Sequence, residues 1–429
     1  MKKMNVVQNV KGTQDYLPNA EMVRKKITKI LEETFVQYGC KPLETPILNY
    51  TELLASKYGG GAEILEEMYT LSDRGERDLA LRYDLTIPFA KVVAMNPTIR
   101  MPFKRYEIGK VFRDGPIKAG RFREFTQCDV DIVGVESQIA EAELMNMALD
   151  AFKKLELNVV IQYNNRKLLT GMLEFFGTDN KLINKVVLIL DKIEKAGLEA
   201  VLAELTELGL HASTIRLIEQ FLIDRNNKKY SYFEHAAKKN ILVKEGIEEL
   251  KELEMYLEYL DLSGQCVFNP FLARGLEIYT GTIYEIFLVD LSIKSSIGSG
   301  GRYDNAIGGL IGSNERISTV GISFGLDVIY SAITASNNFI TKSSHVDFYI
   351  IPLNTMKESL LLARYLRNKG YNVELELGSK KIGKALDKAN KEKIRTVVII
   401  GEDEVKNNQY KMKDMGSGEE RYEDFVFKK

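Results

Sequence analysis

A hairpin with one polar face is the feature that most constrains how this chain can fold. Residues 112–131 read FRDGPIKAGRFREFTQCDVD, with glycine, proline and lysine near the middle and β-favouring residues on both flanks. Such a pattern predicts two antiparallel strands joined by a loop. Because side chains alternate between the faces of a strand, the odd positions share one face. They are Arg121, Arg123, Phe125, Gln127, Asp129 and Asp131, and all of them except Phe125 carry hydrogen-bonding groups. The even positions grow more apolar toward Ile132, so the polar face predicts a floor for a polar ligand.

The composition is that of an ordinary globular chain with little net charge. The 429 residues are 45% hydrophobic and 28% charged, and the formal net charge is −1. This length suffices for two or three domains with sizeable cores. The charge excludes a nucleic-acid binder that works through bulk positive charge, although it leaves room for local basic patches. Any nucleic-acid partner must therefore be bound locally.

The cysteines and histidines show neither a disulfide framework nor a zinc motif. The three cysteines lie far apart with no CxxC pair (Cys40, Cys128 and Cys266), and the three histidines lack ligand spacing (His211, His235 and His345). The first ten residues include lysines but no apolar signal-peptide core, and no run approaches the roughly 18 apolar residues of a membrane span. We therefore expect a cytoplasmic protein that does not enter a membrane.

Helical and extended patterns divide the chain into an α+β domain and a smaller α/β domain. Strand patterns precede a long helical stretch and return after it, at QCVFNPFLARGLEIYTGTIYEIFLVDL. We interpret residues 1–333 as one domain, whose antiparallel sheet is interrupted by a helical insertion at about 165–262. Residues 334–344, TASNNFITKSS, are a linker by composition. Strand and helix patterns alternate over 345–429, which predicts a separate α/β domain with parallel strands.

The small domain contains a near match to a phosphate-binding loop and a lysine-rich helix. GSKKIGKA (378–385) differs by one residue from GxxxxGK[ST], but Ala385 lacks the hydroxyl oxygen that would ligate magnesium. We interpret this segment as a turn before an amphipathic helix, whose buried side carries Ile382, Ala385, Leu386 and Ala389. The other side carries lysines (Lys380, Lys384, Lys388 and Lys391) that fit a nucleic-acid backbone or, as is more usual, an ordinary solvated face.

Several separated segments resemble, in chain order, the signature motifs of histidyl-tRNA synthetases. FRDGPIKAGRFREFTQCDVDIVG resembles the second motif, LARGLEIYTGTIYE the histidine-specific motif, and GSGGRYDNAIGGLIG with TVGISFGLD the third-motif region. GCKPLETPILNY looks like the first motif, with Pro46 as its proline, and the last domain is similar to the family's anticodon-binding domain. The resemblance, which spans nearly the whole chain, implies a class II catalytic domain on an antiparallel sheet and a homodimer formed through the first motif. It also implies the reaction of histidine, ATP and histidine tRNA.

The resemblance further implies which residues bind ATP and promote the reaction. Amino-acid activation brings a carboxylate against the α-phosphate, so fixed cations are needed more than a general base. Arginine suits this role because its planar fork binds phosphate oxygens in pairs and keeps its charge. By resemblance, Arg113 and Arg274 hold the α-phosphate and the reacting carboxylate. Arg121 would reach the outer phosphates, and Phe125 would stack on adenine. Mg²⁺ is expected with ATP, and no protein motif for a metal is evident.

Other positions match those that bind histidine in the family. Asp84, Thr86 and Gln127 match the residues that hold the ammonium. Asp131 and Tyr279 match those that contact the imidazole, and Tyr303 matches a further pocket tyrosine. With Arg113 and Arg274, these residues form the implied histidine site. A site whose buried carboxylate pairs with an N–H donor of the substrate can discriminate against substrates that lack this donor by a factor of roughly 10⁴ or more. For tRNA, the lysine-rich helix suggests contacts from Lys380, Lys384 and Lys388.

Four positions depart from the family pattern. Asp84 and Asp131 stand where many members carry glutamate, and the shorter side chain keeps the charge. Ile278 replaces a tyrosine often seen beside Tyr279. Most important, Val328 follows the acidic residue of the third motif where an arginine is usual, so the ATP tail phosphates lack their usual partner. Arg302 and Arg316 are candidates to replace it.

Two other functions stay open from the sequence. Each residue taken singly also fits a structural role, such as a hairpin surface residue or core packing. A non-catalytic paralogue, the regulatory subunit of ATP phosphoribosyltransferase, typically lacks the anticodon-binding domain and loses catalytic arginines, whereas this chain keeps Arg113, Arg274 and the extra domain. The second alternative is an RNA-binding or amino-acid-sensing protein that retains the pocket without turnover, which Val328 would suit.

Overall fold

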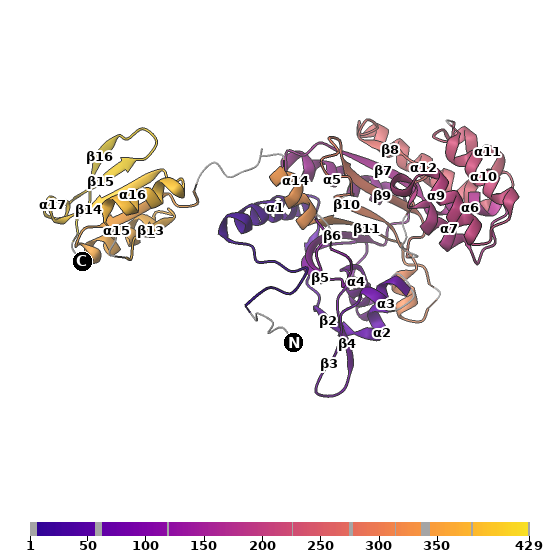
Figure 1. The fold of residues 1–429 in the computed structure, drawn as a ribbon, viewed down its shortest axis with the longest axis horizontal. Helices are drawn as coiled ribbons and strands as arrows, with labels where there is room; N and C mark the ends of the chain where they lie inside the picture. The colour runs from indigo at the N-terminus through magenta and orange to yellow at the C-terminus, as the bar shows by residue number, and fades with distance from the viewer. Residues whose placement is uncertain are drawn as a thin grey trace. The chain divides into compact units, whose positions relative to one another are not determined.

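The described residues form two units, which are drawn in the computed structural model of Figure 1. The structure describes residues 7–55, 62–117, 120–224, 226–273, 278–313, 315–335, 344–378 and 381–427, without the side chains of residues 62–64, 194 and 195. The two units divide between residues 339 and 340, and each has its own hydrophobic core.

The first unit is built on a sheet with the strand order β1-β5-β6-β11-β10-β9-β7-β8. Neighbouring strands are antiparallel except at the edges, where β1 pairs with β5 and β8 pairs with β7 in parallel. The strands are, in chain order, β1 (Lys41–Pro42), β5 (Phe103–Phe112), β6 (Glu124–Val133), β7 (Val159–Asn165), β8 (Cys266–Phe268), β9 (Thr282–Leu288), β10 (Gly298–Arg302) and β11 (Thr319–Gly325). The expected antiparallel sheet is therefore confirmed, with parallel pairs added at its edges.

The polar hairpin forms as the alternation predicts from Glu124 onward, but Arg121 and Arg123, which the pattern places on the second strand, precede β6. Strands β5 and β6 pair antiparallel over ten residues each. On β6, the even positions Cys128, Val130 and Ile132 are buried in the main apolar core. Asp129 and Asp131, at odd positions, therefore lie on the opposite face, where both are also buried. Alternation along one strand thus separates the core from a polar face.

Helices α1 (Pro18–Gln37), α5 (Ile139–Lys154) and α14 (Leu326–Ala335) contribute the apolar residues that cover one face of the sheet. Helix α1 begins with Pro18, whose fixed φ suits a first turn, and ends before Gly39, whose φ of +76° glycine adopts without strain. Ile27, Leu31 and Phe35 recur every four residues and are fully buried. The apolar stripe of α1 therefore faces the sheet.

The opposite face carries a second apolar cluster, which includes residues of α4 (Thr86–Met95) and α13 (Ala306–Leu310). A small sheet of order β2-β4-β3 and two short helices adjoin it: β2 (Leu48–Tyr50), α2 (Thr51–Leu54), α3 (Ala62–Glu67), β3 (Thr70–Ser72) and β4 (Asp78–Leu81). Tyr303 and Ile278 belong to this cluster. Apolar packing and polar residues from the predicted site thus meet on the same face.

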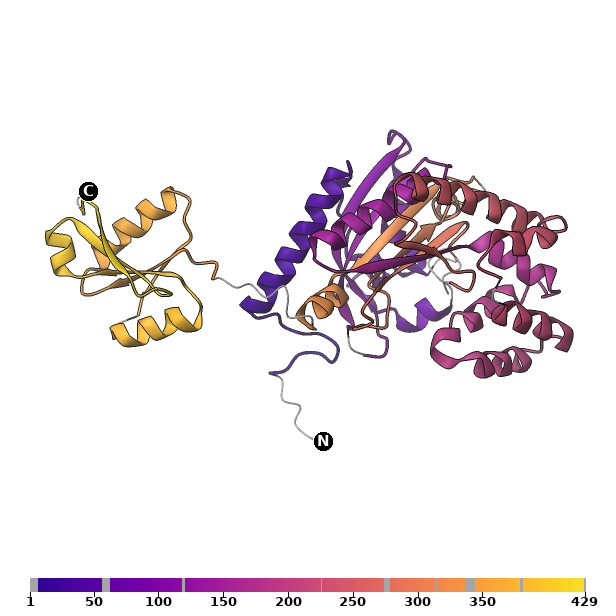
Figure 2. The same ribbon diagram turned by 90° about the horizontal axis from the view of Figure 1, so that it is seen from above.

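A run of helices occupies the chain between β7 and β8. Its members are α6 (Arg166–Phe175), α7 (Ile183–Leu190), α8 (Ile193–Ala196), α9 (Leu198–Glu207), α10 (Ala212–Ile223), the 3₁₀ helix η1 (Tyr230–Phe233), α11 (Glu234–Ala237) and α12 (Ile241–Tyr259). Figures 1 and 2 show most of these helices gathered at the end of the unit away from α1. Their buried side chains are continuous with the main core of the sheet.

The second unit has the strand order β13-β12-β14-β15-β16. Its elements are β12 (Phe348–Pro352), α15 (Met356–Asn368), β13 (Val373–Leu375), α16 (Ile382–Lys391), β14 (Thr396–Ile400), α17 (Glu402–Lys406), β15 (Gln409–Asp414) and β16 (Glu420–Asp424). β12, β13 and β14 are parallel as expected, but β15 runs antiparallel to β14, so the prediction of a parallel strand at YKMKDM was wrong. Only residues 401–408 join β14 to β15, and a parallel crossover needs a dozen or more residues.

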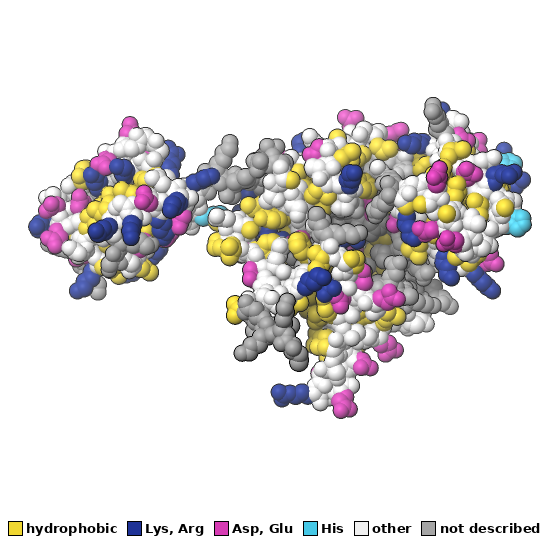
Figure 3. Space-filling model, in the orientation of Figure 1, with side chains coloured by type: hydrophobic (Ala, Val, Ile, Leu, Met, Phe, Trp, Pro, Cys, Tyr) yellow, Lys and Arg dark blue, Asp and Glu magenta, His cyan; other side chains and the backbone are white. Residues whose placement is uncertain are grey.

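The surface mixes charges of both signs. Figure 3 shows lysine and arginine side chains interspersed with aspartate and glutamate on the face in view, as the small net charge implies. Within the described ranges, none of the helices has the length and apolar composition needed to cross a bilayer. The cysteines Cys40, Cys128 and Cys266 are buried free thiols.

Candidate active site

A cavity lies on the polar face of the sheet, where segments far apart in the sequence meet. Strands β6, β10 and β11 contribute to its lining, together with the start of α4 and residues near 279 and 303. The predicted histidine-binding residues that line it are Asp84, Thr86, Asp131, Tyr279 and Tyr303. Ile278, the departure from the family's tyrosine, is buried in the wall. The structure therefore brings together most of the histidine site that the sequence predicts.

Bare backbone makes up part of the cavity lining. Gly300 and Gly301 on β10 and Gly321 on β11 all line the cavity. A Cβ on Gly301 would stand 2.7 Å from the carbonyl oxygen of Thr282, and one on Gly321 would overlap the carboxylate of Asp131. These glycines are therefore required by space, since any side chain at these positions would enter the cavity or displace its wall.

Asp131 is held by two partners beneath the cavity. Arg105 on β5 forms an ion pair with its Oδ2 at 2.6 Å, and the hydroxyl of Tyr303 donates to its Oδ1. Burial raises the pKa of Asp131, which the charge of Arg105 and the hydrogen bond from Tyr303 oppose. The orientation of this carboxylate is thus fixed before any ligand arrives.

Arg105 and Glu107 on β5 extend this network and were missed by the sequence reasoning. Arg105 is 0% exposed and lies 4.2 Å above the ring of Phe89. Glu107 accepts from Arg82 Nη1 at 2.8 Å and from the backbone N–H of Thr45 at 2.9 Å. In the hairpin, Arg105 pairs with Asp131 and Glu107 with Asp129. Their signal was available, because Arg105 and Glu107 are two residues apart in FKRYEIGKVF and so share a strand face, but it becomes meaningful only when the register is known.

Asp84 combines a structural and a binding position. Its Oδ1 accepts hydrogen bonds from the backbone N–H groups of Thr86 and Ile87, both at 3.1 Å, at the start of α4. Acidic side chains favour this position because the first N–H groups of a helix lack intrahelical partners. Burial raises the pKa of Asp84, while these backbone bonds and Arg113 lower it. The helix start therefore fixes one carboxylate at the cavity.

Gln127 and Asp129 lie side by side on the polar face of β6. The amide of Gln127 donates from Nε2 to Ser323 Oγ at 2.7 Å. Its Oε1 is buried and has no hydrogen-bond partner among the described residues. Asp129, to which the sequence reasoning assigned no role, lines the cavity, and its Oδ1 is likewise buried without a described partner.

The predicted ATP-binding residues lie outside the cavity lining or outside the described residues. The guanidinium of Arg113 is stacked between aromatic rings, 4.1 Å from the centre of Tyr83 and 5.1 Å from that of Phe125. Arg113 is therefore near Phe125, the residue expected to stack on adenine. Arg121 is exposed next to the hairpin loop, and Arg274 falls outside the described residues.

The lysine-rich helix α16 presents its predicted faces only in part. Ala385 and Ala389 are fully buried, whereas Ile382 is 37% exposed. Lys388 forms an ion pair with Glu374 and lies 4.9 Å from the ring centre of Tyr349. Lys384 is exposed, and Lys380 is not among the described residues. Of the predicted tRNA-binding lysines, Lys384 is thus the one described with its side chain open to solvent.

The acidic residue of the third motif is held from the N-terminal helix. Asp327 accepts from Arg24 and Tyr16 through Oδ1 and from the backbone N–H of Thr126 through Oδ2 at 2.8 Å. A Cβ added at Gly120 in the hairpin loop would lie 3.5 Å from Val328 Cγ2. Val328 is therefore close to the hairpin loop, at the position where the family usually has an arginine.

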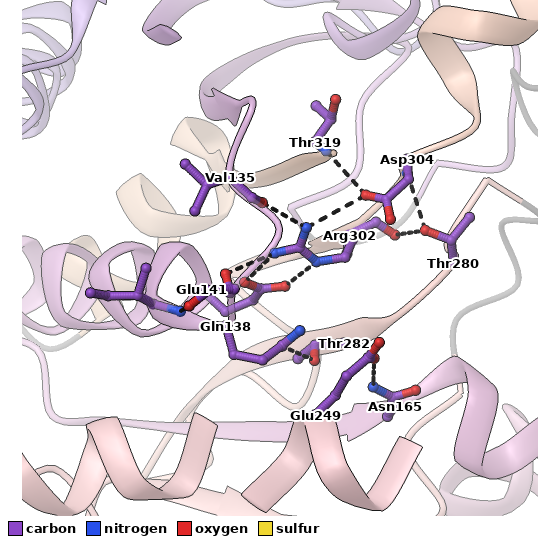
Figure 4. Close-up of polar contacts among 12 residues, drawn as sticks. Val135, Gln138, Glu141, Asn165, Glu249, Thr280, Thr282, Arg302, Asp304 and Thr319 are labelled. Atoms are coloured by element: carbon purple, nitrogen blue, oxygen red, sulfur yellow. Dashed lines mark hydrogen bonds and ion pairs between the residues drawn. The ribbon is translucent and has the colours of Figure 1, made fainter. Parts of the chain in front are cut away.

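Arg302 does not replace that arginine. Figure 4 shows its guanidinium paired with Glu141 on α5, through Nε and Nη2 at 2.7 Å each, and bonded to the carbonyl oxygen of Val135 at 2.9 Å. Arg302 is buried, and its donors are taken by the protein itself. Arg316 pairs with Asp304 at 2.9 Å, and its side chain is 58% exposed.

Comparison with known protein families shows to which family the chain and its cavity belong. A family described as "Histidyl-tRNA synthetase" matches residues 12–329, and one described as "Anticodon binding domain" matches residues 347–425. The chain belongs to the histidyl-tRNA synthetase family. Among curated members of the family, "Histidine--tRNA ligase 2" of Shouchella clausii is 58% identical over 427 residues, which cover 100% of both chains. "Histidine--tRNA ligase 1" of Bacillus cereus is 56% identical over 418 residues, 97% of each chain.

Solved structures agree with the histidyl-tRNA synthetase fold. The crystal structure of histidyl-tRNA synthetase from Nostoc sp. PCC 7120 has a TM-score of 0.82 at 28% identity and covers 97% of both chains. A structure from Bacillus halodurans, titled an ATP phosphoribosyltransferase regulatory subunit/histidyl-tRNA synthetase, has a TM-score of 0.75 at 20% identity, which supports the fold alone. The α+β class II fold with a C-terminal anticodon-binding domain is therefore confirmed.

Proposed function

We propose that this histidine–tRNA ligase binds histidine in the cavity, activates it with ATP and transfers it to the 3′ end of histidine tRNA. The observation that carries the proposal is the meeting of Asp84, Asp131 and Tyr303 in one buried cavity, at positions that match the family's histidine site. Full-length relatives that are named as ligases favour an aminoacyl-tRNA synthetase over a regulatory paralogue.

In the first step, a carboxylate oxygen of histidine attacks the α-phosphorus of ATP. A bond forms between this oxygen and phosphorus, the bond to the oxygen that bridges the α- and β-phosphates breaks, and pyrophosphate leaves. The attacking carboxylate is already ionised, so no proton has to move. Arg113 and Arg274 stabilise the charge on the phosphoryl oxygens, and Mg²⁺ enters with ATP. Arg121 binds the outer phosphates, and Phe125 stacks on adenine.

In the second step, a terminal ribose hydroxyl of the tRNA attacks the carbonyl carbon of histidyl-adenylate. An ester bond forms, the bond from carbon to the phosphate oxygen breaks, and AMP leaves, while the hydroxyl proton passes to phosphate or solvent. In this scheme residues 1–333, with the insertion at about 165–262, are the catalytic domain, and 345–429 bind the anticodon region. Lys384 is the stronger tRNA candidate on α16, since Lys388 is paired with Glu374.

Selectivity for histidine follows from the donors and acceptors of the cavity. Asp131 and Tyr279 contact the imidazole, and Asp84, Thr86 and Gln127 hold the ammonium. Because Arg105 and Tyr303 fix Asp131 in advance, the carboxylate cannot turn to suit a side chain without a ring N–H. An amino acid that lacks this donor leaves a buried acceptor unpaired, which costs binding energy that the correct substrate does not lose.

Histidine-dependent exchange of labelled pyrophosphate into ATP tests the proposed function. We expect exchange with histidine and Mg²⁺, and none when either is omitted. Binding of histidine without exchange would instead indicate a sensor or regulatory subunit, the alternative that Val328 suits. Exchange with proline, threonine or glycine in place of histidine would contradict the substrate while leaving the reaction class intact.

The active form is proposed to be a homodimer formed through the first-motif segment, and it is predicted to work in the cytoplasm. Exposed apolar side chains lie on or next to the small sheet of the single chain: Ile47, Leu48, Tyr50 and Leu71. Apolar surface of this kind is typical of protein interfaces. We expect sedimentation equilibrium to give twice the chain mass, and Leu48→Asp with Tyr50→Asp to shift the protein toward monomer. A wild-type monomer at micromolar concentration would contradict the proposal.

A further inference from the structure

We propose that Asp129 is a further histidine-binding residue, whose free carboxylate oxygen accepts a hydrogen bond from the substrate ammonium. The inference rests on the proposed function of the cavity and adds a specificity-determining residue to it. Asp129 lies on β6 between Gln127 and Asp131, on the face that forms the cavity. It is therefore placed among the residues already assigned to the substrate.

The unpaired oxygen of Asp129 is the observation that points to a ligand. The residue is only 3% exposed, and its Oδ1 has no hydrogen-bond partner among the described residues. Buried polar atoms in native proteins nearly always have partners, so an orphan acceptor on a residue that lines the cavity favours a donor that comes from outside. Ser323 is hydrogen-bonded to the Asp129 side chain, and Arg105, whose Nε and Nη1 also lack partners, acts on it through its charge, but neither gives Oδ1 a hydrogen bond. The donor must carry an N–H or O–H group, and a cationic donor suits a carboxylate best.

Contacts within the cavity favour the ammonium over the imidazole as that donor. Asp131, the residue expected to contact the ring, accepts from the Tyr303 hydroxyl through Oδ1, and its Oδ2 lies 2.6 Å from Arg105 but accepts no hydrogen bond from a described residue, so that Oδ2 is open to a ring N–H. Asp129 instead neighbours Gln127, whose Oε1 is also an orphan acceptor. An ammonium donates three hydrogen bonds, and in this inference Asp84, Gln127 and Asp129 accept them, with Asp129 taking the bond that the family resemblance gives to Thr86. The substrate ammonium therefore satisfies acceptors that the protein leaves open.

Charge around the cavity supports the same assignment. Burial raises the pKa of Asp129 to about 8, with Asp131 and Asp84 adding to the effect and Arg105 opposing it. The groups around it are Arg105 and Glu107 on β5, Asp131 on β6, Ser323 on β11, Asp84 before α4 and Tyr303 after β10. Among the described residues around Asp129, acidic side chains thus outnumber the cationic side chain of Arg105. An incoming ammonium would stabilise the ionised form, so histidine binding releases a proton from Asp129 near neutral pH.

The test compares ligands that differ by one functional group. Histidinol keeps the ammonium and the ring, whereas imidazolepropionate keeps the ring and the carboxylate but lacks the ammonium. In calorimetric titrations, Asp129→Asn is expected to weaken histidine and histidinol binding by roughly 10- to 100-fold and to leave imidazolepropionate binding unchanged. The matched variant Asp131→Asn, two residues along the same strand face, is expected to weaken the binding of all three ligands.

A thermal melt separates binding from a structural role. A buried carboxylate with a raised pKa binds more protons in the folded chain than in the unfolded one, so its destabilising effect grows as pH rises toward that pKa and then levels off. Ligand-free Asp129→Asn should therefore melt at or above the wild-type temperature, with the difference growing between about pH 5 and pH 8. A variant that is destabilised across this range, or that does not fold, would overturn the proposal in favour of a structural carboxylate.

The outcomes also separate this inference from the proposed function. If wild type binds histidine and Asp129→Asn binds it equally well, the inference fails while the function stands. An equal loss for imidazolepropionate and histidine would assign Asp129 to the ring, which overturns the inference as well. If wild type binds neither histidine nor histidinol, the proposed function itself fails.

Discussion

Arg113→Gln is expected to lower histidine-dependent pyrophosphate exchange by about 10² to 10³, the typical cost of removing one preorganised donor to a transition state. The fold should persist, because Arg113 forms no ion pair with a described residue and is held by the rings of Tyr83 and Phe125 and by the carbonyl oxygen of Tyr83. Removal of this guanidinium therefore breaks no ion pair among the described residues, although it takes away a charge that lowers the pKa of Asp84. The loss should appear mainly in kcat, because the charge that Arg113 meets develops during the reaction.

Two further variants define what Arg113 contributes. Arg113→Lys keeps the charge but loses the planar fork, so its exchange rate should fall between that of wild type and Arg113→Gln. Arg395→Gln removes a guanidinium from the second unit, where an 85% exposed side chain pairs with Asp414, and should leave exchange unchanged. Full exchange by Arg113→Gln, with normal histidine binding, would remove Arg113 from the proposed mechanism.

Arg105→Met is expected to lower the free energy of unfolding by about 3–5 kcal/mol, the usual cost of breaking a buried ion pair on one side. Arg105 is fully buried between carboxylates and lies 2.6 Å from Asp131 and 3.7 Å from Glu107. Methionine fills much of the same volume but leaves Asp131 without a cation in a desolvated site. Urea unfolding of the full chain measures the change as a shift in the midpoint of the first unit's transition.

A second substitution shows whether charge is the cause. Asp131→Asn in the Arg105→Met background removes the orphaned carboxylate and should recover part of the lost stability, as coupled neighbours do in a double-mutant cycle. Arg316→Met is the control at an exposed ion pair with Asp304, where about 1 kcal/mol or less is expected. If Arg105→Met is no more destabilising than Arg316→Met, the network beneath the cavity has no stabilising role.

The sequence predicts which side chains share a face of the sheet better than it predicts which residues on neighbouring strands and helices they pair with. Alternation along the hairpin and the order of the motifs located Asp84, Asp131, Tyr279 and Tyr303, and these residues do converge on one cavity. Alternation is a local property, because each residue's face depends only on its distance along the strand. The choice of polar residues for one face was therefore accessible without any knowledge of the fold.

Other parts of the site depend on pairings that a single sequence does not specify. The register of the hairpin places Arg105 opposite Asp131. Arg302 pairs with Glu141, which is 161 residues away in the sequence. The free oxygen of Asp129 likewise becomes visible only when its surroundings are known. The direction of β15 was mistaken because strand propensity indicates that a strand exists but not which way it runs.

The glycines at 300, 301 and 321 give the cavity a wall made of peptide groups that also hold neighbouring strands together. A wall of side chains can adapt to a bulkier ligand by changing rotamers, whereas this wall can retreat only if hydrogen-bonded strands separate. Tolerance for modified amino acids is therefore lowest along this side of the cavity. The discrimination it provides arises from the spacing of the sheet itself, and exchanging side chains elsewhere in the pocket leaves it in place.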